Sequence, residues 1–142
     1  MPAHTRNRLA DKVWHGLTRL VMDNTDTWRR AVVTETGLPF SRVRILMRLA
    51  DRPLTVKEVA AAATIDAPAA TVAVNDLEDR ELVVREINPA NRRCKLVSLT
   101  TAGRDLVAVV RAIDDPAPSV VAGLSDEDLT TLQKIIDKVS SR

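Results

Sequence analysis

The chain has 142 residues and a formal net charge of +2, with 45% hydrophobic but only 2% aromatic residues. This length and composition predict a single domain whose core consists of Val, Leu, Ile and Ala. No run approaches the roughly eighteen apolar residues of a membrane span, no signal-peptide apolar region is expected at the start, and the single cysteine excludes an internal disulfide or a cysteine-based zinc site.

Little in the sequence suits catalysis. It contains two histidines, no tyrosine, no glycine-rich phosphate loop and no cluster of metal ligands. The carboxylates of residues 114–115 and 126–128 lie at a predicted helix end and helix start, where a structural role explains them. We therefore expect that the protein is not an enzyme and that it binds no cofactor and no metal.

The first predicted element is a long amphipathic helix over about residues 5–34, loosened around residues 23–26. Its apolar residues recur at helical spacing: Leu9, Val13, Leu17, Leu20, Trp28 and Val32. Residues 37–39 end it. Ser41 is expected to cap the next helix, which runs to about Ala50 with Arg42, Arg44 and Arg48 on its outer side.

The segment from Thr55 to Thr100 has the order helix, turn, helix, strand, basic loop, strand, which is typical of DNA-binding winged helices. Thr55 and Glu58 fit a capping box, and Asp66 can cap the second helix. The spacing of that helix turns Ala70, Val74 and Leu77 inward. The same spacing turns another group of side chains outward, and this group is the predicted reading face: Thr71, Val72, Asn75, Asp76 and Asp79.

A cationic hairpin follows the predicted reading helix. Residues 82–87 and 96–100 have the pattern of strands, and residues 88–95 between them are predicted to form a loop. Arg92, Arg93 and Lys95 concentrate positive charge there. Such a tip suits the narrow minor groove of a duplex, which attracts arginine.

Charge is unevenly distributed around the reading helix. Residues 41–65 carry a net charge of +3, residues 66–79 carry −4, and residues 80–100 carry +3. The flanking cations are suited to phosphate contacts, which hold a protein on DNA without choosing its sequence. The acidic helix leaves a second hypothesis open, a winged helix that binds a protein partner instead of specific DNA.

The last third of the chain is predicted to be helical with one interruption. Thr100 can cap a helix from about Thr101, the prolines in residues 114–118 break the pattern, and Ser125 can cap the last helix. The last helix carries an apolar stripe along its length: Leu129, Leu132, Ile135, Ile136 and Val139. Because both terminal helices carry such stripes outside the compact central segment, we expect a symmetric dimer built from both chain ends.

Three segments together resemble the MarR family of bacterial transcriptional regulators. Residues 38–65 (LPFSRVRILMRLADRPLTVKEVAAAATI) are similar to its second and third helices, residues 70–83 (ATVAVNDLEDRELV) to its recognition helix, and residues 85–104 (REINPANRRCKLVSLTTAGR) to its wing and the start of its dimerisation helix. The wing segment is the most specific of the three.

The resemblance implies a mainly α fold with a small two- to three-stranded antiparallel β wing. It divides the chain into residues 1–40 (dimerisation), 41–100 (winged helix-turn-helix) and 101–142 (dimerisation). It also implies a cytoplasmic, nucleoid-associated homodimer with no membrane partner. Such a protein would bind palindromic double-stranded DNA, act as a repressor and leave DNA when a small aromatic or anionic effector arrives.

By position, Arg93 matches the family's minor-groove arginine, and residues 68–75 match the part of the recognition helix in the major groove. The expected DNA contacts are Arg42, Lys57, Pro68, Ala69, Thr71, Val72, Asn75, Arg92, Arg93 and Lys95. The family's acidic partner of the wing arginine is replaced by Asn91, and Val72 stands where an arginine is often found. Asn75 can form hydrogen bonds with adenine, and Ala69 or Val72 can contact thymine methyl groups. These contacts would favour an A·T-rich site.

The resemblance places an effector pocket where the first, second and fifth helices of the family meet. The expected lining is Trp14, His15, Trp28, Phe40 and Arg44, although tryptophans are also typical of cores and interfaces. Cys94 lies beside Arg93, and neighbouring cations can activate a thiol. There is no second cysteine to resolve an oxidised Cys94 within the chain.

Overall fold

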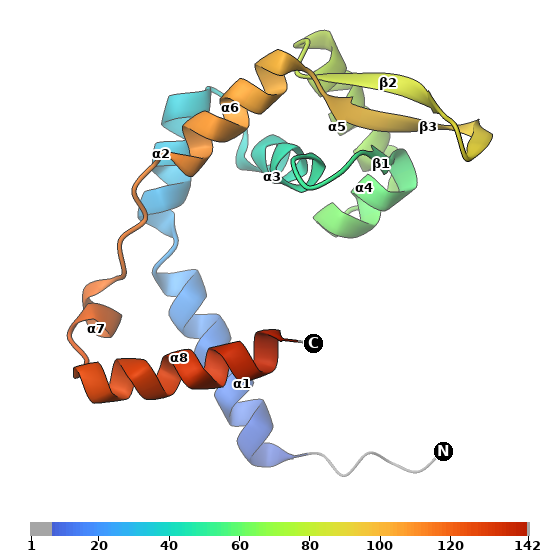
Figure 1. Cartoon of the computed structure of the whole chain (residues 1–142). Coiled ribbons are helices and arrows are strands. Elements are labelled where there is room, and N and C mark those ends of the chain that lie inside the picture. The colour runs from blue at the N-terminus through green and yellow to red at the C-terminus, as the bar shows by residue number, and fades with distance from the viewer. Residues whose placement is uncertain (1–6, 142) are drawn as a thin grey trace, which may run out of the picture. The chain divides into compact units, whose positions relative to one another are not determined.

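The computed structural model describes residues 7–141, which fall into two compact units. The central unit is Thr25–Asp114, and the described part of the chain-end unit comprises residues 7–24 and 115–141. The central unit contains α2 (Asp26–Thr36), α3 (Phe40–Leu49), β1 (Leu54–Thr55), α4 (Val56–Ala63), α5 (Ala67–Asp79), β2 (Val83–Asn88), β3 (Asn91–Leu99) and α6 (Thr101–Arg111) (Figure 1). The chain-end unit contains α1 (Arg8–Asp23), α7 (Ser119–Ala122) and α8 (Asp126–Ser140).

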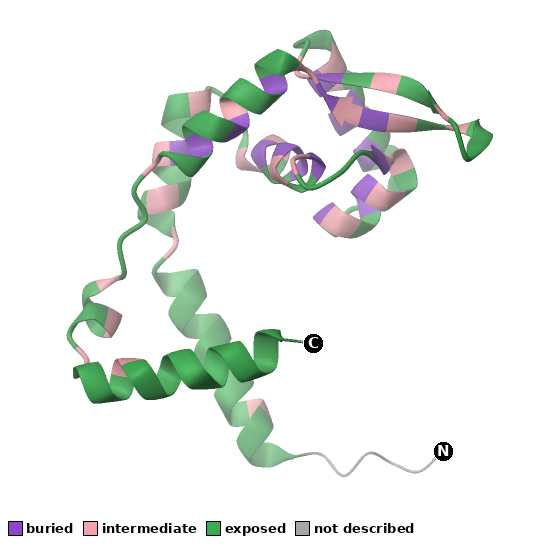
Figure 2. Cartoon of the chain, viewed as in Figure 1, coloured by how far each residue is buried: buried purple, intermediate pink, exposed green. Residues whose placement is uncertain are grey.

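The core lies entirely in the central unit (Figure 2). Its largest fully buried side chains are Ile45, Leu46, Leu77, Val32, Val43, Val59, Val74, Val83 and Val97. No polar or charged residue among the described ones is buried. The expected core of aliphatic residues and alanine is therefore confirmed.

The mainly α fold with a small antiparallel wing is also confirmed. The three strands have the order β1-β3-β2 and are antiparallel. Val83 pairs with Leu99 and Arg85 with Val97 across β2 and β3, while Leu54 of β1 pairs with Val97 on the other side of β3. The strand β3 thus joins the wing to the body of the unit.

The basic segment is strand rather than loop, so the predicted loop over residues 88–95 is wrong. Only Pro89 and Ala90 separate β2 from β3. The side chain of Asn88 accepts from the amide of Ala90 at 3.0 Å, and that of Asn91 accepts from the amide of Arg93 at 3.1 Å. These bonds close a short turn, and both faces of the ribbon beyond it are largely exposed, so no apolar alternation marks it in the sequence.

Most predicted helix starts are confirmed. The Thr55–Glu58 capping box is formed, and Asp66, Thr100 and Ser125 cap α5, α6 and α8 through their side chains. The Ser41 cap is wrong, because extended Pro39 precedes α3 and its carbonyl accepts from the amides of Arg42 and Val43. The predicted first helix is divided at Asn24 and Thr25 into α1 and α2.

The chain-end helices bury none of their residues (Figure 2). Exposed apolar side chains follow the two long ones, including Leu9, Val13, Trp14, Leu17 and Leu20 on α1 and Leu132, Ile135, Ile136 and Val139 on α8. None of the described helices combines the length and the apolar character needed to cross a membrane. The contiguous exposed apolar side chains of each stripe form a surface that suits a protein partner.

Gly103 determines how closely α6 approaches the base of the wing. A Cβ at this position would overlap the carbonyl oxygen of Leu82 and crowd the side chain of Leu99. The same carbonyl accepts from the amide of Thr100 at 3.1 Å, so it cannot move without weakening that bond. Close helix–strand contact therefore requires glycine here.

We expect Gly103→Ala to lower the free energy of unfolding by about 1–3 kcal/mol, the usual cost of overpacking a tight contact. Urea unfolding followed by circular dichroism measures it. Gly16→Ala is the matched control, since nothing lies within 4 Å of a Cβ there and α1 should gain helix propensity. Equal stability of the two variants would contradict the steric explanation.

Candidate nucleic-acid interface

The helix α5 presents a narrow exposed face beside a fully buried one. Ala70, Ala73, Val74 and Leu77 are each 0% exposed. Pro68, Ala69, Thr71, Val72 and Asn75, all predicted DNA contacts, are exposed. The side-chain oxygen of Asp66 accepts from the amide of Ala69 at 2.7 Å and fixes the first turn. The predicted reading face therefore exists as a surface.

The negative charge of Asp76 is compensated by two arginines within the protein. Its carboxylate accepts from Nε of Arg42 at 2.9 Å and from Nε of Arg80 at 3.1 Å. The hydrogen bond from Arg42, and next the one from Arg80, lowers the pKa of the Asp76 carboxyl below its usual value. Arg42 comes from α3, so this ion pair also holds α3 to α5. The acidity that favoured a protein-binding winged helix is thereby reduced.

Arg85 of β2 belongs to this surface although no sequence pattern assigned it there. Its Nη2 donates to the side-chain oxygen of Asn75 at 2.6 Å, and its Nη1 lies 3.7 Å from a carboxylate oxygen of Glu78. Its Nε is buried without a hydrogen-bond partner among the described residues. The available signal was strand alternation, which places Arg85 on the same face of β2 as buried Val83.

This contact changes what Asn75 can read. Paired recognition of adenine requires the amide oxygen of asparagine as acceptor and its NH₂ as donor. The oxygen of Asn75 already accepts from Arg85, whereas the NH₂ group donates to no described residue. Asn75 is therefore set up to donate to a base acceptor, and adenine would have to share the oxygen with Arg85.

The wing presents two guanidinium groups to solvent. Arg92 and Arg93 are exposed on β3, and neither side chain forms a hydrogen bond or ion pair with any residue in the range 7–141. Asn91 binds the backbone of Arg93 and lies 3.6 Å from the sulfur of Cys94, so it shapes the turn instead of holding a guanidinium. Both arginines can therefore bind an anion without first breaking a contact to the described chain.

The structure brings three further predicted contacts together. Lys57 of α4, Thr71 of α5 and Lys95 of β3 line one hollow of about 440 Å³, which we call the wing hollow. Arg85, Thr55 and half-buried Cys94 also line it. Three cations facing one concavity suit a backbone phosphate.

The predicted effector residues separate into two groups. Trp28, Phe40 and Arg44 line a hollow of about 340 Å³, which we call the aromatic hollow. The rings of Trp28 and Phe40 meet edge to face with centroids 5.6 Å apart, and the guanidinium of Arg29 lies 4.6 Å from the Phe40 centroid. An aromatic ring with a nearby anion suits this lining.

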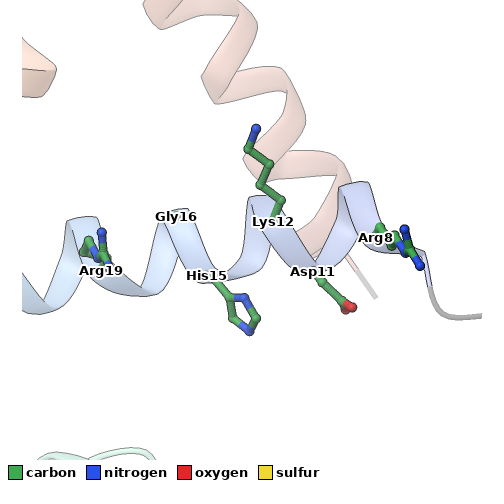
Figure 3. Close-up of a pocket in the computed structure, with 6 residues that line it drawn as sticks. All are labelled: Arg8, Asp11, Lys12, His15, Gly16 and Arg19. Carbon is green, nitrogen blue, oxygen red and sulfur yellow. The ribbon is translucent and has the colours of Figure 1, made fainter.

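Trp14 and His15 lie on α1, in the chain-end unit, and do not line the aromatic hollow. Trp14 is 66% exposed. His15 belongs to a polar face of α1 with Arg8, Asp11, Lys12 and Arg19 (Figure 3). This face of α1, with Gly16, lines a separate hollow to which no other described element contributes.

Comparison with known proteins agrees with this geometry. Residues 36–93 match the model of the MarR family. The chain is 28% identical over 134 residues to transcriptional regulator HosA of Escherichia coli O111:H-, covering 92% of this chain and 96% of that protein.

Two solved structures share the fold. CouR from Rhodococcus jostii RHA1, bound to p-coumaroyl-CoA, is 26% identical with a TM-score of 0.67, covering 94% of this chain and 95% of that one. A mutant of S. aureus MepR, bound to an oligodeoxyribonucleotide, is 22% identical with a TM-score of 0.61, covering 90% and 96%. The similarity thus extends beyond the winged helix to nearly the whole chain.

The ion pairs of Asp76 predict a pH dependence of stability. A lowered pKa in the folded state means that the ionised carboxylate stabilises the protein above its unfolded-state pKa. That contribution is lost as pH falls through the folded-state pKa. We therefore expect the stability difference between the unsubstituted protein and Asp76→Asn to be largest near neutrality and to shrink below about pH 4.

Urea unfolding at a series of pH values measures this difference. Asp79→Asn is the matched control, because Asp79 is exposed on the same helix and forms no ion pair within the described part of the chain. A difference for Asp76→Asn that did not change with pH would contradict the assignment.

Proposed function

We propose that this chain, whose residues 36–93 match the MarR family model, is a sequence-specific transcriptional regulator of that family that binds palindromic operator DNA as a homodimer. The observation that carries the proposal is the exposed face of α5 together with exposed Arg92 and Arg93 of the wing, whose guanidinium groups bind no other residue of the range 7–141. The MepR structure with an oligodeoxyribonucleotide supports DNA as the partner. Regulation of transcription would take place in the bacterial cytosol, most simply as repression.

The interface would make two kinds of contact with DNA, to base edges and to phosphates. Thr71, Val72 and Asn75, with Pro68 and Ala69 in the first turn, would meet base edges in the major groove. Lys57, Lys95 and Arg92 would bind phosphates, and Arg93 would enter the minor groove. Arg42 is engaged by Asp76, so its DNA contact would be made with the nitrogens left outside that bond.

The dimer would form through the chain ends. The apolar stripes of α1 and α8 are exposed in one copy, and a second copy supplies a surface of the same chemistry. Paired reading helices must then lie roughly 34 Å apart, one turn of the duplex. This geometry is what makes a palindromic site the natural target.

An effector would bind in the aromatic hollow. Trp28 and Phe40 offer ring contacts, and Arg44, Arg48 and Arg111 line the same hollow as anion partners. The CouR structure with p-coumaroyl-CoA is a relative bound to an aromatic, anionic ligand. A small aromatic anion that releases the protein from DNA is therefore part of the proposal.

Fluorescence anisotropy with the upstream intergenic DNA of the protein's own gene tests DNA binding, with a scrambled duplex of equal length as control. A specific regulator should prefer the upstream DNA by about a thousandfold or more, and binding to both should weaken steeply with salt. Absence of binding at low salt would overturn the proposal in favour of a protein-binding module.

Reversing the wing charges should remove DNA affinity without breaking the dimer. For the double variant Arg92→Glu/Arg93→Glu we expect weaker binding to every duplex, with a salt slope reduced by about 1 for each phosphate that is no longer bound. Arg30→Glu, an exposed charge reversal on α2 outside the proposed interface, is the control, and its effect on affinity should be less than half of that of the double variant. Unchanged affinity of the double variant would contradict a role for the wing.

The dimer interface can be tested separately by sedimentation equilibrium. Ile135 is 52% exposed in one copy, so Ile135→Asp should leave the central unit folded while shifting the protein toward monomer. The matched control is Thr131→Asp, which adds the same charge at an exposed polar position of α8. Equal dimer strength in the two variants would place the interface elsewhere.

A further inference from the structure

A large concavity of the central unit lies on a part of the surface that the proposed DNA contacts do not use. It is a hollow of about 690 Å³ at the side of α6, bounded by the end of α3, the loop before β1 and the end of β3. Its floor includes the buried side chains of Leu49, Leu99 and Val107. We call it the α6 hollow.

We propose that the α6 hollow binds a small organic anion with an apolar body, as a second ligand site beside the aromatic hollow. A volume between about 300 and 1,000 Å³ with mainly apolar walls and a few charged groups is typical of sites for small molecules. The hollow has this size, and its lining combines mainly apolar residues with a few charged ones. The proposal does not depend on DNA binding.

Two arginines of α6 define the charge of the site. Arg104 and Arg111 are seven residues apart, which places them on one face of the helix about 10 Å apart along its axis. Val107 and Ala108 lie between them in the same lining. An apolar body over these two residues would hold its anionic group at one guanidinium or the other.

Neither of these guanidinium groups is engaged by the described part of the chain. Arg104 and Arg111 form no side-chain hydrogen bond or ion pair with a residue that the structure describes. The third arginine, Arg52, is different, because it is bound to Glu58 at 2.9 Å. Asp51 is the one acid among the described lining residues, so the balance of charge still favours an anion.

Ser98 adds a neutral polar residue to the lining. Its backbone belongs to the wing sheet, where Ser98 pairs with Val84. Ser98 is half-buried, and its hydroxyl makes no hydrogen bond within residues 7–141. A carboxylate that bound a guanidinium could also accept from this hydroxyl, and charge-assisted hydrogen bonds are the stronger kind.

The test uses 2-naphthoate as the probe and neutral 2-naphthalenemethanol as its matched control, followed in ¹⁵N-labelled full-length protein by NMR. We expect naphthoate to shift the amides of Ser98, Leu99, Val107 and Ala108. Arg104→Gln and Arg111→Gln should each weaken naphthoate binding about tenfold, the scale of one charge-assisted hydrogen bond. Binding of the alcohol should stay weak and unchanged by either substitution.

Substitutions of Arg104 and Arg48 distinguish binding in the α6 hollow from binding in the aromatic hollow. Arg111 and Asp51 line both, whereas Arg104 lines only the α6 hollow and Arg48 only the aromatic hollow. Naphthoate binding that is weakened by Arg48→Gln but not by Arg104→Gln would overturn the proposal, as would the absence of shifts at millimolar probe. Thermal unfolding of Arg104→Gln confirms that the variant is folded, which is expected for an exposed side chain. The anisotropy result with DNA does not affect any of these outcomes.

Discussion

Alanine at positions 70 and 73 lets α5 lie close against its neighbours, and this close packing is the constraint on which the rest of the central unit depends. With Val74 and Leu77, these residues are fully excluded from solvent, so the rotation of α5 about its axis is determined. Once that face is buried, Thr71, Val72 and Asn75 have only one direction left, outward. The reading surface is thus a consequence of core packing.

The same packing brings charged side chains from two neighbouring elements against α5. Arg42 from α3 and Arg85 from β2, with Arg80 at the C-cap of α5 itself, reach Asp76, Asn75 and Glu78. They do so without complete burial, so their charges remain partly screened by water and their contribution to stability is modest. Their larger effect is on position, since they hold polar side chains of the helix in one orientation and reduce its negative charge.

The sequence by itself determined the order of the main helices and of the two wing strands, the starts of α4, α5, α6 and α8, the inward face of α5, the apolar stripes of the chain ends and the cationic character of the wing. These features are local, because capping residues and apolar spacing act over a few residues. It also identified Trp28, Phe40 and Arg44 as potential neighbours through family resemblance. The start of α3 and the extent of β3 were not predicted correctly, since backbone geometry at Pro39 and at the two-residue turn outweighed composition.

Only the tertiary structure decided which charges neutralise one another and which stay available. Arg42 and Asp76 are 34 residues apart, and Arg85 meets Asn75 across the packing of β2 on α5. Nothing in the local pattern distinguishes Arg42 and Arg85, which are engaged, from Arg104 and Arg111, which form no ion pair with described residues. That distinction depends on distances between elements, and packing alone sets those distances.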